Sequence, residues 1–258
     1  MDLELKGKTA LVTGSTAGIG LAIATALARE GAAVIVNGRT EARVDHAVRM
    51  SGAAYGIAAD LGTEAGARAV IERFPSVDIL VNNLGIFEPK PFEEIPDDDW
   101  RRFFEVNVLS GVRMSRHYIG PMKHQNWGRI VFISSESALQ IPKEMIHYGM
   151  TKTAQLAIAR GLAETTAGTG VTVNSVLSGP TKSEGVLAFV DKLAAANGVD
   201  SDAVEREFFA KVRPSSLLQR FAATEEVAAV VAFVCSPLAS AINGAGVRAE
   251  GGILQSIA

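Results

Sequence analysis

Three residues have the types and the spacing that proton transfer requires. Tyr148 and Lys152 lie four positions apart in a stretch with helical spacing, so their side chains share one face. A phenol has an ordinary pKa of about 10 and transfers protons poorly near neutral pH unless cations stabilise its phenolate. Lys152 supplies one such cation, and Ser135, at the end of an apolar run, can hold a substrate oxygen beside the phenol. The three residues predict acid–base chemistry at a substrate oxygen.

A glycine-rich segment near the N-terminus predicts a nucleotide site. It follows an apolar run at residues 9–13 and leads into a helical stretch at residues 21–29. A strand, a glycine turn and a helix start place backbone N–H groups and the positive end of the helix dipole against a pyrophosphate. A plain tight turn stays open as the alternative. The residues predicted to contact the nucleotide are Gly14, Ser15, Thr16, Gly18, Ile19 and Gly20.

The ends of the next two strands predict which nucleotide binds. An acidic residue after the second strand would bind a ribose 2′-hydroxyl, but the chain has Asn37-Gly38-Arg39 there. Arg39 offers a planar cation for a 2′-phosphate, so NADP(H) is favoured over NAD(H), with a solvated arginine as the alternative. Asp60-Leu61 ends the third strand, where Asp60 can accept from an adenine amine or can cap the next helix.

The elements that position these residues form a β-α repeat. Continuous apolar strands, each followed by a helical stretch, imply a parallel sheet that is covered on both faces. The chain of 258 residues suits one domain. We therefore predict an α/β fold, a single-domain doubly wound parallel sheet of about seven strands with helices on both faces. The predicted strands are residues 9–13, 34–36, 54–58, 79–81, 130–133 and 171–176, with a short seventh near 247–249.

Residues 182–220 break this rhythm. The segment follows a strand, and an insertion after a parallel strand lies at the carboxyl edge of the sheet, where ligands bind. We interpret it as a substrate lid, and an extra packing helix is the alternative. The residues predicted to line the substrate pocket beside it are Leu84, Glu136, Gln140 and Met145.

Composition and charge exclude several classes of partner. The chain has 25 Lys and Arg against 28 Asp and Glu, with no basic run, so we expect no nucleic-acid partner. The uncharged stretches 9–28 and 227–247 are interrupted by glycine and polar residues, so we expect no membrane span. The single cysteine, Cys235, and an acidic N-terminus without an export signal predict a cytoplasmic protein.

No metal site is predicted. The four histidines have no ligand spacing. The acidic residues between positions 93 and 99 precede a helical stretch at residues 100–122, and we interpret them as helix-capping groups. A hydrolase built on Ser135 and His147 is set aside, because no Gly-x-Ser-x-Gly turn surrounds the serine.

Together with further motifs, these residues make the sequence resemble the short-chain dehydrogenase/reductase family along nearly its whole length. The resemblance implies a Rossmann-type fold, a nicotinamide cofactor and reversible hydride transfer at a carbonyl or alcohol carbon. The matching motifs are Thr13-Gly14-x-x-x-Gly18-Ile19-Gly20, Asp60, Asn82-Asn83-Leu84-Gly85, Asn107, Ser135, Tyr148-x-x-x-Lys152 and Asn174-x-Val176.

The resemblance also implies a role for each site residue. Tyr148 would be the general acid in reduction and the general base in oxidation, and Lys152 would lower its pKa and bind the nicotinamide ribose. Ser135 would orient the carbonyl, and Asn107 would hold a water that links Lys152 to solvent. The cofactor contacts implied in addition are Asn83, Gly85, Gly179 and Ser183.

The sequence departs from the family pattern beside the expected nicotinamide. Leu84 replaces the usual alanine, and Ser178-Gly179 replaces the usual Pro-Gly, with Pro180 one residue late. We therefore expect a different backbone path in this loop. The substrate is expected to be a small carbonyl compound or alcohol, and the resemblance implies a homotetramer or homodimer formed through helices 100–122 and 148–163.

Two other functions are weighed against this one. A 3-oxoacyl-acyl-carrier-protein reductase would grip an acidic carrier with basic residues at positions that match Asn126 and Thr169, and both are uncharged here. A dinucleotide-binding sensor without catalysis usually lacks the tyrosine or the lysine, whereas this chain has both.

Overall fold

Seven parallel strands form one sheet in the computed structural model, which describes residues 2–257, without the side chains of Phe189, Ala196 and Asn197. The strand order is β3-β2-β1-β4-β5-β6-β7, and every pairing is parallel. The predicted doubly wound sheet is confirmed. The order reverses between β1 and β4, where folds of this kind bind ligands. The strands are β1 (Thr9–Val12), β2 (Ala33–Gly38), β3 (Tyr55–Ala58), β4 (Ile79–Asn82), β5 (Gly128–Ser135), β6 (Val171–Ser178) and β7 (Gly246–Ala249).

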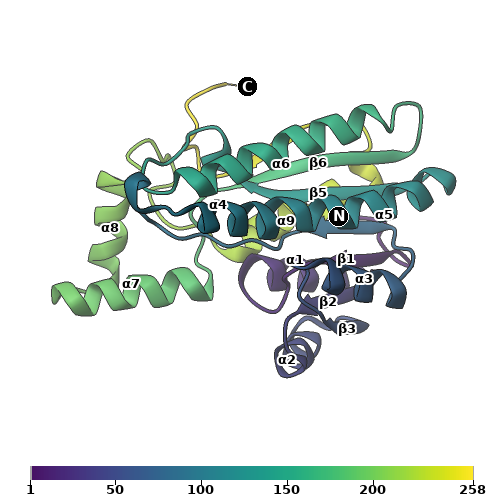
Figure 1. Cartoon of the computed structure of the whole chain (residues 1–258), viewed down its shortest axis with the longest axis horizontal. Helices are drawn as coiled ribbons and strands as arrows, with labels where there is room; N and C mark the ends of the chain where they lie inside the picture. The colour runs from purple at the N-terminus through teal and green to yellow at the C-terminus, as the bar shows by residue number, and fades with distance from the viewer. Residues whose placement is uncertain (1, 258) are drawn as a thin grey trace.

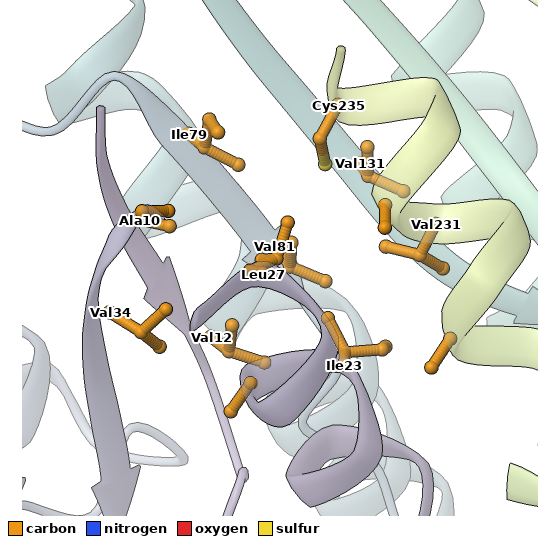
Figure 2. Packing of buried hydrophobic residues seen from close by; sticks show 14 of the residues in the cluster. Ala10, Val12, Ile23, Leu27, Val34, Ile79, Val81, Val131, Val231 and Cys235 are labelled. Atoms are coloured by element: carbon orange, nitrogen blue, oxygen red, sulfur yellow. The ribbon is translucent and has the colours of Figure 1, made fainter. Parts of the chain in front are cut away.

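Helices cover both faces of the sheet (Figure 1). The continuous apolar strands require this, because their side chains alternate between the faces. Val12 packs with Ile23 and Leu27 on one side (Figure 2), whereas Leu11 packs with Met114 on the other. One face carries α1 (Gly18–Arg29), α2 (Glu41–Ser51) and α9 (Thr224–Cys235), and the other carries α3 (Glu64–Arg73), α5 (Ser110–His124) and α6 (Ile146–Glu164).

The helical stretch predicted for residues 100–122 exists, but it is longer and a π-helical turn interrupts it. The structure has α4 (Asp97–Phe104), one π-helical turn η2 (Glu105–Leu109) and then α5. The π-helical turn inserts one residue into the hydrogen-bond register, and such turns are frequent at functional sites. Asn107 lies within this turn. Three short 3₁₀ turns complete the assignment, η1 (Phe92–Glu94), η3 (Glu136–Ala138) and η4 (Pro237–Ala239).

The acidic run ends in the first turn of α4 and acts differently from the prediction. Pro96 is the N-cap residue, and no side chain caps this helix within the described part of the chain. The carboxylates instead form ion pairs, such as Asp98 with Arg101 at 2.8 Å and Asp99 with Lys90. Their place in the first turn still complements the helix dipole, so that part of the interpretation holds.

Two helices after β6 form the segment interpreted as a lid. They are α7 (Glu184–Asn197) and α8 (Ser201–Lys211), and they lie at one end of the molecule, on the left of Figure 1. The segment has a small apolar cluster of its own, and a parallel bridge between Thr181 and Ala222 joins its two ends. The buried members of the cluster are Val190, Ala194, Val204, Phe209 and Phe221.

Three further findings concern residues 2–257 as a whole. No helix in this range has both the length and the apolar character that a membrane crossing needs. No group of three or more His, Cys, Asp or Glu in this range is placed to hold a metal ion. The Cys235 thiol is buried, and burial raises its pKa to about 12, so it is a poor nucleophile.

Candidate active site

Ser135, Tyr148 and Lys152 come together at the carboxyl edge of the sheet. Ser135 is the last residue of β5, and α6 carries the other two. The Lys152 Nζ lies 5.5 Å from the centre of the Tyr148 ring. The Ser134 hydroxyl donates to the Lys152 carbonyl oxygen at 3.0 Å, which fastens α6 to the end of β5. The structure therefore brings the three predicted side chains together at one place.

Lys152 is buried in spite of its charge. Its Nζ donates to the Ile133 carbonyl oxygen at 2.8 Å and to the Gln155 Oε1 at 3.3 Å. Burial lowers the pKa of Lys152 to about 8, although the negative charge of Glu136 opposes the change. A buried lysine with a lowered pKa is typical of functional sites.

The side chain of Tyr148 is half-buried and lines the cavity beside Ser135. Burial raises its pKa above the ordinary value, and the nearby Glu136 carboxylate raises it further. The Ser135 hydroxyl and the Arg213 guanidinium act in the opposite direction and do not balance burial. The lowering that the sequence predicts is therefore absent in the protein alone, and it requires a further positive charge at the site.

Asn107 holds the loop after β4 against α6. Its Nδ2 donates to the Ile86 carbonyl oxygen at 2.9 Å and to the Thr151 Oγ1 at 3.0 Å, and its Oδ1 accepts from the Ile86 N–H at 2.8 Å. A Cβ on Gly85 would lie 3.6 Å from both the Asn107 Oδ1 and the Lys152 Nζ, so the Gly85 backbone lies beside both groups. The side chain of Asn107 thus has a positioning role, and its predicted water stays a prediction.

A buried ion pair lies next to Ser135. The Ser135 hydroxyl donates to the Glu136 carboxylate, whose second oxygen accepts from the Arg213 Nε at 3.1 Å. The Arg213 Nη1 also donates to the Glu144 Oε1 at 3.2 Å. The sequence predicts Glu136 in the pocket. It does not indicate that Arg213 pairs with Glu136, because 77 positions separate the two residues and no motif links them.

A cavity of about 560 Å³ opens between these side chains and the segment at 182–220. Glu136 and Met145, two of the four residues predicted for the pocket, line it together with Ser135 and Tyr148. Its far side is mostly apolar and comes from α7, α8 and the residues after them. These apolar residues are Val186, Val190, Leu193, Val204, Phe208, Val212 and Phe221.

Two residues predicted for this pocket do not line it. Leu84 packs against the core on the α5 side of the sheet and lies over Gly14, where its Cα would be 3.1 Å from an added Cβ. Gln140 is exposed in the loop before α6. Both predictions treated nearness in sequence to a site motif as nearness in space, and the direction of the side chain decided otherwise.

The glycine-rich loop fits a pyrophosphate. Gly14 and Gly18 have φ angles of +60° and +55°, which side chains other than glycine rarely adopt. Helix α1 then begins at Gly18 with no side-chain cap and no acidic residue in its first turn within the described residues. Its first N–H groups are therefore available to an anion.

Asn83 holds this loop in place. Its Nδ2 donates to the carbonyl oxygens of Thr13 and Gly14 at 2.9 and 3.0 Å. A Cβ on Gly20 would come within 2.4 Å of that nitrogen, so the first turn of α1 lies directly against the end of β4. The loop around Gly85 is in this way fixed relative to the nucleotide loop.

Several predicted cofactor residues serve the scaffold with their side chains. Asn37 is buried, and its Nδ2 donates to the carbonyl oxygens of Ile57 and Ala59 while its Oδ1 accepts from the Gly14 N–H. Ser15 is buried and bonds to the Val12 carbonyl oxygen. The N–H groups of Asn37 and Ser15 also bond to each other's residue, so these two residues shape the loop from beneath.

The end of β3 leaves Asp60 accessible. Its Oδ1 accepts from the Gly62 N–H at 3.0 Å, and the side chain is exposed. The alternative that Asp60 caps the next helix is wrong, because Thr63 caps α3 through its bond from the Gly66 N–H. The neighbouring Leu61 side chain is buried in the core.

The end of β2 offers no space for an acidic side chain. A Cβ on Gly38 would lie 2.3 Å from the Cγ2 of Thr16 in the nucleotide loop. Arg39, the next residue, is exposed. The position where NAD(H) sites carry an acidic residue therefore has no carboxylate, and the next residue is a cation.

The predicted contacts after β6 lie between the nucleotide loop and the cavity. Ser183 caps α7, and its Cβ would be 3.1 Å from a Cβ added to Gly18. Gly179 and Ser183 both line the cavity. The Ala222 N–H donates to the Pro180 carbonyl oxygen at 3.0 Å, which fixes the backbone path of the unusual Ser178-Gly179-Pro180 loop.

Comparison with known proteins agrees with this geometry. Residues 8–193 match the family described as short chain dehydrogenase. The chain belongs to this family. It is 50% identical to YvaG of Bacillus subtilis, an uncharacterized oxidoreductase, over 100% of both chains. It is 34% identical to the 3-oxoacyl-acyl-carrier-protein reductase FabG of Aquifex aeolicus, over 98% of this chain and 100% of that one.

A solved structure is similar over the whole chain. It is the L-sorbose reductase of Gluconobacter frateurii in complex with NADPH and L-sorbose, with a TM-score of 0.93, 29% identity and 100% of both chains covered. This short-chain dehydrogenase is therefore an oxidoreductase with a Rossmann-type fold, and its cofactor class is a nicotinamide dinucleotide.

Proposed function

We propose that this short-chain dehydrogenase is NADP(H)-dependent and transfers hydride between the nicotinamide and a small carbonyl compound or alcohol. The observation that carries the proposal is the convergence of Ser135 and Tyr148 on one wall of a cavity that also reaches Ile19 and Ser183 beside the nucleotide loop. A substrate oxygen in this cavity meets a proton donor at the point where the dinucleotide loop opens.

The proton is handled by residues of this chain. Bound NADPH would supply the hydride to the carbonyl carbon. In that direction the Tyr148 hydroxyl gives its proton to the carbonyl oxygen, and in oxidation the phenolate takes the proton back from the alcohol. Ser135 orients the substrate oxygen, and Lys152 binds the nicotinamide ribose and restores the proton of Tyr148.

The cofactor is held by the nucleotide loop and the ends of three strands. The N-terminus of α1 binds the pyrophosphate, and Arg39 binds the 2′-phosphate. Asp60 receives the adenine amine, while the backbone of Asn83 and Gly85 faces the ribose. Gly179 and Ser183 meet the nicotinamide. With oxidised cofactor bound there, Tyr148 would gain the additional positive charge that it needs to ionise.

The cavity favours a substrate without charge. Its two cationic wall residues among those described already have partners: Arg213 pairs with Glu136 and Glu144, and Lys211 pairs with Glu207 at 2.6 Å. A substrate carboxylate would meet more negative than positive charge. The apolar side formed by α7 and α8 acts as a lid over an uncharged, partly apolar substituent.

Reduction of 3-oxoacyl chains on a carrier protein is the second candidate, supported by the FabG relative. Asn126 and Thr169, where a carrier grip would need basic residues, are uncharged. We therefore rank free small molecules above carrier thioesters. We also propose that the protein is cytoplasmic and forms a homotetramer or homodimer. Light scattering of the purified protein tests the oligomeric state.

The function is tested by a panel of free ketones, aldehydes and their alcohols. Consumption of NADPH, or reduction of NADP⁺, is followed by the absorbance of the reduced nicotinamide, with NADH and NAD⁺ in parallel. We expect turnover of small uncharged substrates with NADP(H). A strong preference for acyl-carrier thioesters would overturn the ranking, and tight NADPH binding without turnover of any compound would favour a dinucleotide sensor.

A further inference from the structure

The ion pair between Glu136 and Arg213 joins the lid to the catalytic serine. The side chains of Glu136 and Arg213 are 5% and 9% exposed, so both charges lie away from solvent. Buried charges are stable only when paired, and removal of one partner leaves the other uncompensated. Each of the two buried charges is therefore stable only while the other is present.

The pair controls the geometry of Ser135. Without substrate the Ser135 hydroxyl donates to Glu136 and accepts from the Ser137 N–H at 3.1 Å, so its oxygen is held in place while its proton can turn to a substrate oxygen. Because Glu136 is itself held by the Arg213 Nε, the orientation of Ser135 depends on a residue that follows α8.

Arg213 is anchored on the lid side as well. Its N–H donates to the Phe208 carbonyl oxygen at 3.1 Å, and its guanidinium lies 5.9 Å from the centre of the Phe208 ring. The same side chain bonds to Glu144 in the loop before α6. Arg213 thus connects three segments that surround the cavity.

We propose that Glu136 and Arg213 are positioning residues, which together couple the placement of the lid to the orientation of Ser135 and to the charge around the Tyr148 phenol. This inference rests on the proposed function, because Ser135 and Tyr148 are its reacting groups. Nothing in the motifs of the chain assigns either residue a role, and Arg213 comes from outside the sheet.

The charges around the phenol make the proposal testable by sign. Glu136 disfavours the phenolate of Tyr148, and Arg213 favours it. Lys152, from α6, is the other charged group that faces Glu136, and Glu144 acts through Arg213. Loss of Arg213 leaves Glu136 unbalanced, whereas loss of Glu136 leaves a cation beside the phenol. The two changes must therefore act in opposite directions.

The experiment measures kcat/KM for alcohol oxidation as a function of pH, with NADP⁺ and an alcohol from the panel. The rising limb reports the base of the enzyme–NADP⁺ complex, which is the form that binds the alcohol. We expect Arg213→Gln to move its midpoint up by about one pH unit and Glu136→Gln to move it down. The double variant Glu136→Gln/Arg213→Gln is expected to return toward the wild-type midpoint, with a lower kcat because Ser135 has lost its anchor.

Two controls separate positioning from folding. Arg206→Gln removes an exposed arginine of α8 that pairs only loosely with Asp200, at 3.9 Å, and is expected to keep the wild-type midpoint. Arg213→Lys keeps the charge but loses the Nε bond, so its midpoint stays while kcat falls. If Arg213→Gln does not fold, Arg213→Lys and Glu136→Gln still test the inference, since the first is expected to keep the wild-type midpoint with a lower kcat and the second to lower the midpoint.

Midpoints that do not move, or that move in the same direction in both single variants, would overturn the inference while wild-type turnover leaves the proposed function intact. Absence of turnover in wild type and in Arg206→Gln alike would instead contradict the proposed function itself.

Discussion

The methyl group of Thr16 covers Gly38. A Cβ on Gly38 would lie 2.3 Å from the Thr16 Cγ2, well inside van der Waals contact. The loop that we propose to bind the pyrophosphate is therefore packed directly against the strand end that we propose to distinguish the two dinucleotides. As a result, the usual route to NAD(H) binding, an acidic side chain at this position, is blocked by a residue of the nucleotide loop.

Gly38→Asp tests this packing. We expect the variant to lose NADPH affinity, because a carboxylate repels the 2′-phosphate, and to gain no NADH affinity while Thr16 keeps its place. The double variant Thr16→Ala/Gly38→Asp has room for the carboxylate and is expected to bind NADH about 10-fold more tightly than the single variant. Fluorescence titration of both cofactors measures this, and a gain in NADH affinity by Gly38→Asp alone would contradict the packing argument.

Arg39→Ala tests the proposed 2′-phosphate contact. Loss of a charge-assisted hydrogen bond is expected to weaken NADPH binding about 10-fold and to leave NADH binding nearly unchanged. Arg29→Ala is the matched control, because Arg29 is an exposed arginine at the opposite end of α1. Equal losses for the two cofactors would show that Arg39 does not contact the 2′-phosphate.

Lys152→Met tests the burial of the lysine that we propose to be catalytic. Its pKa is lowered from 10.5 to about 8 in the folded protein. The free energy of unfolding is therefore unaffected by this shift above pH 10.5, falls as the pH decreases from 10.5 to about 8, and has lost the full amount below about 8. Below that pH the wild type carries a buried charge at a cost of at most about 3 kcal/mol. We expect the inactive variant to gain stability relative to wild type near pH 7 and to lose this advantage near pH 10.

The measurement is the difference in Tm between variant and wild type across that pH range. Lys6→Met, at an exposed lysine, is the control and should show little pH trend. A difference for Lys152→Met that stays constant, or that grows toward high pH, would mean that the lysine is not strained by its burial.

Substrate charge is tested with a matched pair of ketones. Methyl acetoacetate and acetoacetate have the same reacting carbonyl and differ in one charge. Because Arg213 and Lys211 are already paired, we expect kcat/KM for the neutral ester to exceed that for the acid by about 10-fold or more. Glu144→Gln should narrow the gap. Equal or better use of the acid would refute the assignment of an uncharged substrate.

The fold follows from features that a single sequence contains. Each of the seven predicted strands exists, because long apolar runs and glycine turns leave few other arrangements. The break at η2 was missed because apolar periodicity does not show a shift of one residue in the hydrogen-bond register. Asn107 was still identified, since its motif is recognisable even though the turn that presents it is not.

The site is predictable only where neighbouring residues determine it. Tyr148 and Lys152 are one helical turn apart, so their meeting follows from helix geometry. Arg213 reaches Glu136 across 77 positions through the folding of α7 and α8, which no local pattern specifies. The pocket predictions for Leu84 and Gln140 were wrong for the converse reason. Both residues are close in sequence to site residues, but neither side chain lines the cavity.

The central claim is that Tyr148 moves the proton that accompanies hydride transfer. Tyr148→Phe removes one hydroxyl. The control is Tyr118→Phe, because Tyr118 is a buried tyrosine whose hydroxyl donates to the Phe74 carbonyl oxygen at 2.7 Å. We measure kcat with NADPH and a substrate from the panel, together with the Kd of NADPH. The account predicts that Tyr148→Phe loses at least about 100-fold in kcat with an unchanged Kd, while Tyr118→Phe remains active. Substantial turnover by Tyr148→Phe would contradict it.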